Sequence, residues 1–579
     1  MILAEWLLWL VPLSGAALVP VVSHTKKEAT GWFAVAVASA SLLLSLYGAL
    51  TFSAAETENL AVWLGFLNVQ LQVTIDGLSV LVSVFVAFLS LLILIFSLGY
   101  MKGEGGLARY YSLVLLFVGS MLGLVMAGNL IQFYFFWELV GLCSALLIAF
   151  WSDREAARRA GLKAFVVTHI GDASLLMAVI VLFNALQTTS FASVLASVGG
   201  SSLQGTALLT VGVLIIVGAM GKSAQVPLHV WLPDAMEGPS TVSALIHAAT
   251  MVNAGVYLVI RMFPLFQASG LLMDLLLGVG LLSASVGAVN ALASEDLKRV
   301  LAYSTISQLG LMFVALGLGS WVAATYHMVS QGLFKALAFL AAGSVIHATG
   351  TRNLEEMGGL KRVMKYTYVG FLAAVLAMSG LPPLIGFWSK DAIVSAAFAG
   401  NSTVGFALIA ISVVTASYGF RALIKVFHGE PAQQRSVRES ATTMVAPIAV
   451  LAVSVVVAWL ALDAQSFVNI GSLAFPSATT FTLSMGALVV GALVSYVAFS
   501  ARPSATKQLM ERSQAMVRLR DALLEGLGFD RLYNYLYARG VKGLASLTSK
   551  VETGALGWDT ALVLLTLILL TVLVAGGLV

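Results

Sequence analysis

Three lysines, Lys222, Lys335 and Lys390, lie inside apolar segments that are long enough to cross a membrane. A lysine at the centre of a bilayer costs roughly 2.5–3.5 kcal/mol on insertion scales, so it is seldom kept there without a task or a partner. A buried lysine changes its pKa readily, whereas an arginine stays charged. We therefore expect these three side chains to take up and release protons.

Four further ionisable residues fall within apolar stretches: Glu138, Asp172, His247 and His327. A row of buried acids, bases and histidines can hold, pass and release protons. Together with the three lysines they form the candidate catalytic set, a proton relay in which we expect no bound cofactor and no metal ion.

Glu138 lies in the aromatic run FYFFWELVG, which carries no other charge. A nearby lysine would keep its carboxylate ionised, and Lys222, at the predicted broken helix 207–236, is the predicted partner. If an approaching charge separated this pair, Lys222 would lose its stabilising neighbour and release a proton. The alternative is a structural ion pair that only joins two helices.

His169 and Asp172 are three residues apart and share a helix face. Asp172 is either a second counter-ion, a group through which protons enter from the cytoplasm, or half of an ordinary helix–helix hydrogen bond. His247 falls between the two lysine-bearing halves of the chain. An unperturbed pKa near 6.5 suits an imidazole to passing protons in both directions, although a lone histidine in a helix is usually structural.

Toward the second half of the row, His327, Gln331 and Lys335 follow one another at intervals of four, which places them on one helix face. Lys390, followed by Asp391, is the predicted point of outward release. A sodium path is the alternative, because carboxylates and freed carbonyls are hard oxygen ligands. Lysines at the narrow points argue against a cation there.

The composition indicates a membrane protein that crosses the bilayer many times, because 59% of the 579 residues are hydrophobic and only 10% are charged. Apolar stretches of about 20 residues recur and predict helices rather than a β-barrel. The one cysteine, Cys143, excludes an intrachain disulfide and a cysteine-ligated cluster, and no nucleotide-binding motif is present.

Basic residues follow the loops in alternation, since 27 of the 31 lysines and arginines fall in every second loop or in the C-terminal tail. The positive-inside rule predicts that these loops are cytoplasmic and that the N-terminus faces outward. We therefore expect a multi-pass protein of a prokaryotic cytoplasmic membrane, with the lipid bilayer as a partner and no nucleic-acid binding.

The predicted fold is an all-α polytopic bundle of about 16 transmembrane helices. The spans are 2–22, 31–52, 76–100, 110–128, 131–151, 161–186, 207–236, 240–262, 271–292, 299–318, 322–347, 367–398, 404–427, 444–462, 480–500 and 559–578. Prolines interrupt 207–236 just after Lys222 and 367–398 just before Lys390. Two broken helices in corresponding places predict a transport site between two inverted five-helix repeats, although a proline pair can also simply kink a packed helix.

These patterns divide the chain into six predicted parts. They are the N-terminal transmembrane helices (1–109), the first repeat (110–262), the second, inverted repeat (271–427), peripheral transmembrane helices (428–503), a basic amphipathic helix on the cytoplasmic face (504–556) and a C-terminal transmembrane anchor (557–579). The amphipathic helix is either a connector or a lateral brace along neighbouring subunits.

Several strings resemble a known family: DGLS at Asp76, AGNLIQFYFFWELVGLCS at 127–144, GKSAQVPLHVWLPDAMEGPSTVSALIHAATMVNAGVYL at 221–258 and FKALAFLAAGSVIHA at 334–348. The sequence resembles the antiporter-like membrane subunits of respiratory complex I, in the L-type (mitochondrial subunit 5) branch. This resemblance implies a proton axis at Glu138, Lys222, Lys335 and Lys390, with His247 as the bridge and Asp172 as an auxiliary acid.

Three departures from this family stand out. Gln331 occupies a position where a second histidine is usual, and THI precedes Gly171 where NRV is common, which weakens a functional interpretation of His169. The tail also looks roughly 20 residues shorter than a full lateral helix, worth about 30 Å.

The resemblance implies a proton-translocating subunit of a complex I-like pump, in which this chain does no redox chemistry. Quinone, flavin and iron–sulfur clusters would then be bound only by partner subunits, and the partners would include further antiporter-like membrane subunits. The alternatives are an Mrp-type Na⁺(K⁺)/H⁺ antiporter subunit and a proton-conducting partner of an inorganic-carbon uptake system.

Overall fold

The structure is a computed structural model that describes residues 2–65, 69–200, 203–429, 437–462, 473, 476–501 and isolated positions between 513 and 539. The chain divides into two compact units, Met1–Val517 and Arg518–Val579, and the helices of the membrane bundle belong to the first of them. The predicted amphipathic helix at 504–556 lies almost entirely, and the predicted anchor at 557–579 wholly, outside the described residues.

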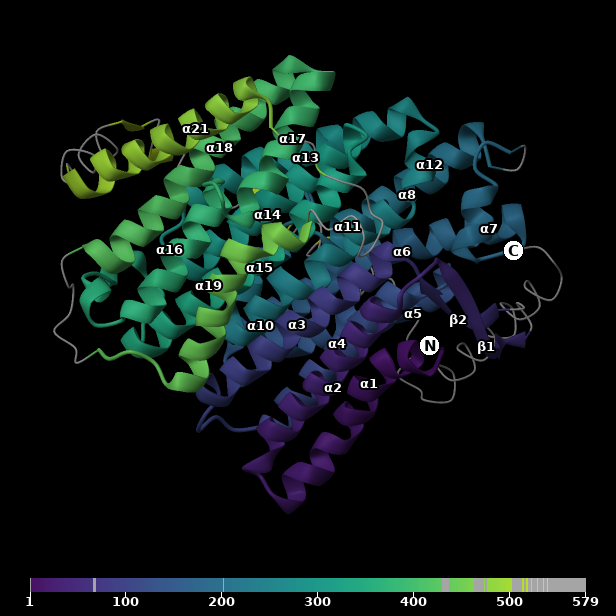
Figure 1. Ribbon diagram of the computed structural model, residues 1–579, viewed down its shortest axis with the longest axis horizontal. Coiled ribbons are helices and arrows are strands. Elements are labelled where there is room, and N and C mark those ends of the chain that lie inside the picture. Colours follow the sequence, from purple (N-terminus) through teal and green to yellow (C-terminus); the bar gives the residue numbers. More distant parts are fainter. Residues whose placement is uncertain are drawn as a thin grey trace. The chain divides into compact units, whose positions relative to one another are not determined.

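Helices account for most of the described chain (Figure 1). The α-helices are α1 (Ile2–Thr25), α2 (Ala29–Thr51), α3 (Gly77–Tyr100), α4 (Leu107–Met126), α5 (Leu130–Ile148), α6 (Glu155–Leu186), α7 (Phe191–Ala196), α8 (Gly205–Lys222), α9 (Trp231–Asp234), α10 (Ser240–Ala244), α11 (Met251–Arg261), α12 (Phe263–Gln267), α13 (Gly270–Ala293), α14 (Leu297–Gly317), α15 (Trp321–Thr349), α16 (Lys365–Ser379), α17 (Ile385–Gly400), α18 (Ser402–Leu423), α19 (Thr442–Leu462) and α21 (Ala478–Tyr496). The short 3₁₀ and π segments are η2 (Ala235–Glu237), η3 (Leu245–Ala249), η4 (Leu354–Glu356), η5 (Leu360–Arg362), η6 (Ile424–His428) and η7 (Val497–Ala501).

Within the described residues, 14 helical stretches are long and apolar enough to cross a membrane. They match 14 of the predicted spans. The predicted span 367–398 is divided into α16 and α17, and the predicted span 559–578 lies outside the described residues. The prediction of an all-α polytopic membrane protein is confirmed.

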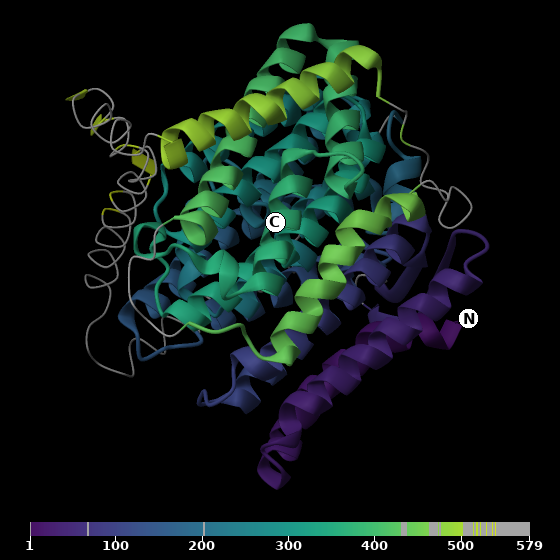
Figure 2. The same cartoon turned by 60° about the vertical axis from the view of Figure 1, so that its left-hand side comes forward.

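The most deeply buried helices form the middle of the bundle. The stretch that contains α10, η3 and α11 is wholly buried within the chain, and α14 and α15 are almost so. Figures 1 and 2 show α1 and α2 at one edge of the bundle and α18 and α21 at another. The central helices therefore carry polar side chains away from lipid.

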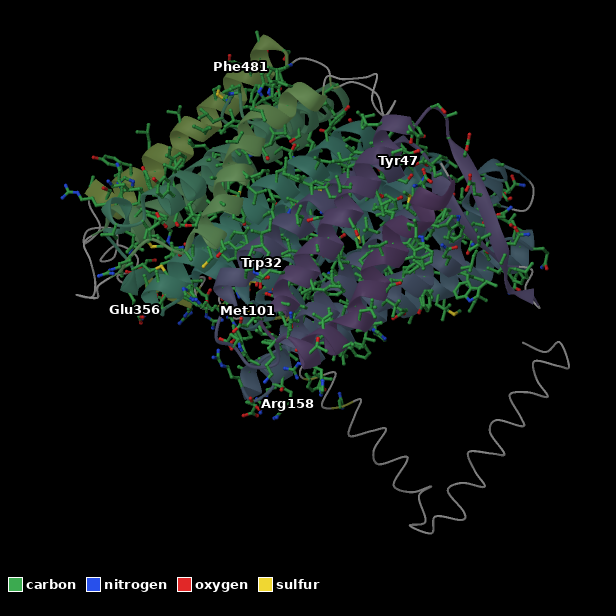
Figure 3. The ribbon with its side chains drawn as sticks, turned by 60° about the horizontal axis from the view of Figure 1, so that its bottom comes forward. Trp32, Tyr47, Met101, Arg158, Glu356 and Phe481 are labelled. Carbon is green, nitrogen blue, oxygen red and sulfur yellow. The ribbon has the colours of Figure 1, made fainter. Side chains whose placement is uncertain are left out.

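Successive loops along the chain lie at opposite ends of the helices. Met101 follows α3, Arg158 lies in the first turn of α6 and Glu356 is the last residue of η4, and Figure 3 shows all three along the same edge. Tyr47 and Phe481, which lie at the other ends of their helices, are on the opposite side of that view. The alternation of charge along the chain therefore corresponds to two faces of the folded bundle.

Both predicted helix breaks are present. After α8 the chain leaves the helix through Ala224, which has a positive φ of 48°, and resumes only at α9. The second break, between α16 and α17, begins at Gly380 with a φ of +86° and contains the adjacent Pro382 and Pro383. The backbone amide of Val226 in the first break donates to Ser283 Oγ at 3.0 Å, so part of the freed backbone is satisfied by a neighbouring helix.

A β-hairpin, which the sequence analysis did not predict, occupies part of the 51–74 loop. Strand β1 (Glu56–Leu64) pairs with β2 (Val69–Ile75) in antiparallel register, with Glu56 opposite Ile75. The free edge of β2 is covered, because Gln72 O accepts from Gly128 N at 3.2 Å. The hairpin thereby lies against the loop between α4 and α5.

An ion pair joins the hairpin end of α3 to the end of α11. Asp76 caps α3 by accepting from Ser79 N at 2.8 Å, and its carboxylate also accepts from Arg261. Burial alone would raise the pKa of Asp76, but the Arg261 guanidinium and the Ser79 hydrogen bonds outweigh it and hold that pKa below its usual range. The carboxylate is therefore charged throughout the physiological pH range.

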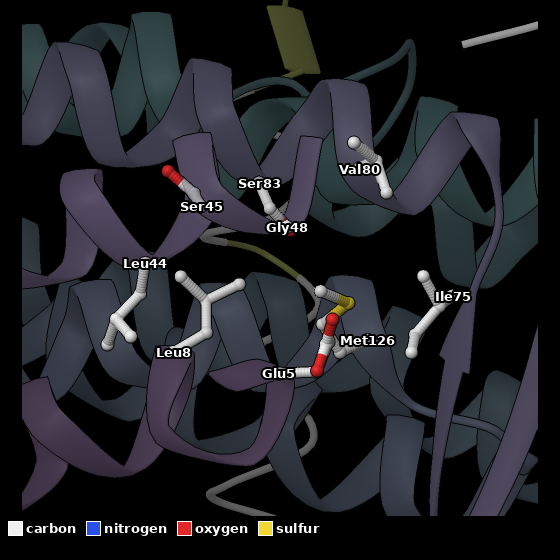
Figure 4. Close-up of a pocket in the computed structure, with 9 residues that line it drawn as sticks. All are labelled: Glu5, Leu8, Leu44, Ser45, Gly48, Ile75, Val80, Ser83 and Met126. Carbon is white, nitrogen blue, oxygen red and sulfur yellow. The ribbon is translucent and has the colours of Figure 1, made fainter. Parts of the chain in front are cut away.

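A second buried acid lies apart from the predicted row, on α1. Glu5 is only 4% exposed and lines a cavity of about 10 Å³, just large enough for one water molecule, between α1, α2 and α3. Figure 4 shows its carboxyl group beside Met126, with Ser45 and Ser83 across the cavity. Glu5 Oε2 and Ser83 Oγ have no hydrogen-bond partner among the described residues.

This arrangement predicts that Glu5→Met stabilises the protein, because it removes a buried polar group that lacks a partner. The expected gain is about 1–2 kcal/mol, seen as a higher thermal midpoint of the detergent-solubilised protein. Glu28→Met, at an exposed acid between α1 and α2, is the matched control and should be neutral. A clear loss of stability in Glu5→Met would mean that the carboxyl group is satisfied in the cavity after all.

Candidate proton-relay site in the membrane

The centre of the first half is a buried ion pair between Lys222 and Asp172. Lys222 Nζ lies 3.0 Å from Asp172 Oδ2, and the two side chains are 0% and 1% exposed. The other carboxylate oxygen, Oδ1, accepts from Trp137 Nε1 at 2.6 Å. Glu138 was predicted as the partner of Lys222, and this prediction is wrong, because Asp172 on α6 contacts the ammonium instead.

Glycines explain why α6 and α8 come close enough for this contact. A Cβ added at Gly171 would lie 3.0 Å from the Cα of Gly221, so the two backbones touch next to Asp172 and Lys222. On α5, a Cβ added at Gly141 would collide with Lys222 Nζ. The ammonium therefore lies in a notch that only the missing side chain of Gly141 leaves open.

Lys222 is also the last residue of α8, where the helix dipole favours a positive charge. The chain turns away directly after it, and Trp231 Nε1 donates to the carbonyl of Gly221 at 3.0 Å across the break. The predicted broken helix thus places the lysine at a helix end, beside backbone carbonyls that the break has freed.

Two further side chains connect this pair to the surface of the chain. His169 Nδ1 lies 3.2 Å from Asp172 Oδ2, and His169 Nε2 lies 3.5 Å from Glu138 Oε2. Glu138 is 27% exposed and His169 is 39% exposed, on the face formed by α5 and α6. Glu138 is therefore at the outer end of a contact chain that reaches Lys222 through His169 and Asp172.

His247 lies in the π-helical segment η3, which the sequence analysis did not foresee. It is fully buried, its ring lies 4.6 Å from that of Phe339, and neither ring nitrogen has a partner among the described residues. Gln331 Nε2 donates to the backbone carbonyl of His247 at 2.9 Å. The glutamine thus connects α15 to the helix segment that carries the histidine.

Lys335 lies in a pocket of neutral groups. Its ammonium donates to Ser304 Oγ and, at 3.3 Å, to the carbonyl of Leu301, and it approaches Met378 Sδ at 3.7 Å. No carboxylate pairs with it among the described residues. This lysine therefore differs from Lys222, which has a charged partner.

His327 bridges two helices close to Lys390. Its Nδ1 lies 3.0 Å from Ser389 Oγ on α17, and its Nε2 lies 3.1 Å from Gln308 Oε1 on α14. The adjacent Lys390 follows the second break and is 6% exposed, and its Nζ has no hydrogen-bond partner among the described residues.

The structure thus brings Glu138, Asp172 and Lys222 together, through His169. His247, Lys335, His327 and Lys390 lie on neighbouring central helices, with no direct side-chain contact from one to the next among the described residues. Sequence reasoning missed the roles of Trp137 and His169. The three-residue spacing from His169 to Asp172 was a signal for the histidine, but the tryptophan stood out only as one of several aromatic residues.

The model of one protein family, "NADH:quinone oxidoreductase/Mrp antiporter, TM", matches residues 127–417, just over half of the chain. A second, "NADH-Ubiquinone oxidoreductase (complex I), chain 5 N-terminus", matches residues 63–111. The chain is 40% identical over 450 residues to NAD(P)H-quinone oxidoreductase chain 5 of a Synechocystis species, a match that covers 73% of this chain and 66% of the relative. The chain belongs to the NADH:quinone oxidoreductase/Mrp antiporter family.

The chain is also similar to NADH-quinone oxidoreductase subunit L of Rickettsia conorii. It is 41% identical over 382 residues, which cover 65% of this chain and 58% of that protein. The chain therefore spans about two thirds, or less, of the length of these relatives.

Among solved structures, the chain is similar to one in the Mrp complex from a Dietzia species, with 28% identity and a TM-score of 0.80 over 99% of this chain and 63% of that one. It also shares its fold with a chain of the archaeal membrane-bound sulfane sulfur reductase, with a TM-score of 0.78 over 97% of this chain and 99% of that one, at 23% identity.

The notch at Gly141 yields a test of the site geometry in this family member. Gly141→Ala should destabilise the protein by about 1–3 kcal/mol, because the new methyl group overlaps Lys222 Nζ in a packed interior. Gly278→Ala is the matched control, since it also lies within a helix but faces open space, and it should stabilise by about 0.5–1 kcal/mol. The measurement is the thermal midpoint of each purified variant.

Shortening the lysine should relieve the overlap, so Lys222→Met should cost less stability in the Gly141→Ala background than in the wild type. Equal effects of Lys222→Met in both backgrounds would show that Gly141 does not determine the position of the ammonium.

Proposed function

We propose that this chain is a proton-translocating membrane subunit of a complex I-like, redox-driven pump. Protons move along the buried row of Glu138, Asp172 and Lys222, then His247, Lys335, His327 and Lys390, while quinone reduction takes place in partner subunits. The observation that carries the proposal is the fully buried Asp172–Lys222 contact at a helix break.

The ion pair can act as the driven element of a pump. While Asp172 and Lys222 are in contact, the ammonium stays charged beside a carboxylate. When they separate, the ammonium is buried without a counter-ion, and a buried unpaired charge is removed most readily by loss of its proton. Anything that alters the charge on Asp172 therefore decides whether Lys222 keeps or releases its proton.

The second half of the row is suited to receiving that proton. Lys335 is held by a hydroxyl and a carbonyl, and Lys390 Nζ has no partner among the described residues, so neither lysine has a charged partner there. His247 lies on η3 and His327 lies on α15, the helix that also carries Lys335, and each imidazole can accept a proton at one nitrogen and donate from the other. Water molecules would bridge the gaps between these side chains.

The redox chemistry belongs to other subunits in this proposal. The single cysteine, Cys143, is buried in α5, and the chain has no cysteine set with which to hold an iron–sulfur cluster. Flavin, iron–sulfur clusters and quinone are therefore assigned to partners, which include further antiporter-like membrane subunits. The basic loops face the cytoplasm of a prokaryotic cell and the N-terminus faces outward, as the positive-inside rule implies.

A second candidate function is an Mrp-type Na⁺(K⁺)/H⁺ antiporter subunit. The similarity to a chain of the Dietzia Mrp complex, which extends over 99% of this chain, favours it. The two functions share the proton row and differ in what drives it, namely quinone reduction or an opposing cation gradient.

Proton pumping should be lost in Lys222→Ala and in Glu138→Ala, because each removes a member of the row. Removing one partner of a buried ion pair costs about 3–5 kcal/mol, so Lys222→Ala also leaves Asp172 uncompensated. The measurement is donor-driven acidification of inverted vesicles that contain the whole complex, with assembly checked on native gels. Lys102→Ala, at an exposed loop lysine, is the control and should pump normally.

If both variants assembled and pumped at the wild-type rate, the central row would not be the proton path. The same vesicles separate the two candidate functions. Acidification that requires a quinone-reducing donor supports the redox pump, whereas proton movement driven by a Na⁺ or K⁺ gradient without any donor supports the antiporter.

A further inference from the structure

His169 is the one ionisable side chain that the structure adds to the predicted row. Its two ring nitrogens face two different carboxylates: Nε2 lies 3.5 Å from Glu138 Oε2, and Nδ1 lies 3.2 Å from Asp172 Oδ2. We infer that His169 is a proton-carrying residue that links Glu138 at the surface of the chain to the buried Asp172–Lys222 pair. This inference rests on the proposed function and adds the step by which protons reach the pair.

The placement of the carboxylates favours a proton bridge over a metal site. The oxygen and nitrogen atoms of Glu138, His169 and Asp172 lie within 4.8 Å of one another. A single metal ion, however, binds an imidazole through one nitrogen, and here the carboxylates lie at opposite nitrogens. An imidazole with an acid at each end is instead arranged to accept a proton on one side and give one up on the other.

The transfer balances without any further reactant. The carboxylic acid of Glu138 gives its proton to Nε2 while the proton on Nδ1 passes to the carboxylate of Asp172. The products are a Glu138 carboxylate, the other neutral tautomer of His169 and a protonated Asp172. Protonated Asp172 no longer neutralises Lys222, so the ammonium releases its own proton onward, and one proton has entered for each one that leaves.

The first two members of this link are partly exposed and the last two are buried. The side chains of His169 and Glu138 are 39% and 27% exposed, whereas Asp172 is 1% and Lys222 is 0% exposed. The surrounding face of α5 and α6 is apolar and includes the exposed side chains of Phe135, Leu142, Leu146, Leu162, Val166 and Ile170. Glu138 and His169 are thus a polar opening in an apolar face, and the buried pair lies directly behind it.

The histidine ring is positioned but not locked. Phe165, one turn earlier on α6, stacks against it with ring centroids 4.0 Å apart. Nδ1 is within 3.2 Å of Asp172 Oδ2 and yet makes no hydrogen bond in this orientation. A small rotation of the ring therefore completes or interrupts the link, which is the behaviour of a gate rather than of a fixed structural contact.

Few charged groups lie around His169, so a change in the pH profile of pumping can be assigned to this side chain. Glu138 faces it from α5, Asp172 from its own helix and Lys222 from α8. Tyr134 lies one turn before Glu138. The segments α9 and η2 also pack on α6, but their acids have partners elsewhere: Asp234 pairs with Lys163 and Arg299, and Glu237 pairs with Arg352.

The test compares two replacements of His169 in vesicles that contain the whole complex. His169→Arg supplies a permanent cation between the two carboxylates, and His169→Gln supplies a neutral hydrogen-bonding group, but neither can pass a proton. Both should reduce donor-driven acidification by about tenfold or more, and both should lose the part of the pH profile that depends on titration of the imidazole. His428→Gln, at a histidine that bonds Tyr368 away from the row, is the matched control.

A third variant distinguishes the loss of proton transfer from a folding defect. His169→Ala should be inactive and should recover acidification when imidazole is added to the vesicles, because the side chain lies at the surface. A wild-type rate and pH profile in His169→Arg would overturn the inference and assign the histidine a structural charge. The proposed function is judged separately: if Lys222→Ala abolishes pumping while the His169 variants do not, only the link through His169 is wrong.

Discussion

The ion pair between Asp172 and Lys222 is the constraint on which the site depends. Both groups are removed from water, so their attraction has to offset two desolvation costs, and it does so only at a short distance with the remaining lone pairs satisfied. Trp137 satisfies the second carboxylate oxygen, and the glycines of α5, α6 and α8 permit the close approach. The packing of three helices is therefore set by one polar contact.

The two halves of the row stabilise their buried lysines in different ways. In the first half Lys222 has a carboxylate, and the pair can be closed or opened. In the second half Lys335 is stabilised by neutral oxygens, and Lys390 Nζ has no partner among the described residues. A positive charge is therefore stabilised more strongly at Lys222 than at Lys335 or Lys390. Directional proton transfer needs such an asymmetry.

Gln331 joins the halves through a contact that involves no titratable group. It holds the backbone carbonyl of His247, where the π-helical turn leaves carbonyls without their regular helical partners. The usual second histidine of the family is thus replaced here by a residue that supports the histidine-bearing turn. In the proposed relay, water rather than a side chain carries the proton between His247 and Lys335.

The sequence was sufficient for features that depend on local chemistry. Prolines beside Lys222 and Lys390 predicted both helix breaks, because proline cannot continue a helix. Apolar length predicted the spans, because a bilayer sets that length. The assignment of Lys222 to Glu138 failed because the choice between two nearby acids depends on helix rotation and on glycine contacts, neither of which is visible in one sequence. The repeat relation between 110–262 and 271–427 stays a prediction.

Among the features that were not predicted, β2 does carry a local signal, because apolar and polar residues alternate along Val69–Ile75. The π-helical turn at His247 has no distinctive residue pattern. The surroundings of His169 depart from the family pattern, which argues against a role when the sequence is taken alone. Its importance follows from two carboxylates on different helices that meet its ring, a relation that exists only in three dimensions.

The edge of β2 has a consequence for biogenesis. Gln72 O binds Gly128 N, and Leu130 N in turn binds Thr189 O, so three loops form one continuous set of backbone contacts. Two membrane crossings separate each loop from the next, which brings all three to the same side of the bilayer. Because the chain is synthesised from the N-terminus, the hairpin exists before either later loop. Each later loop then completes its backbone contacts with a segment that is already present on that side.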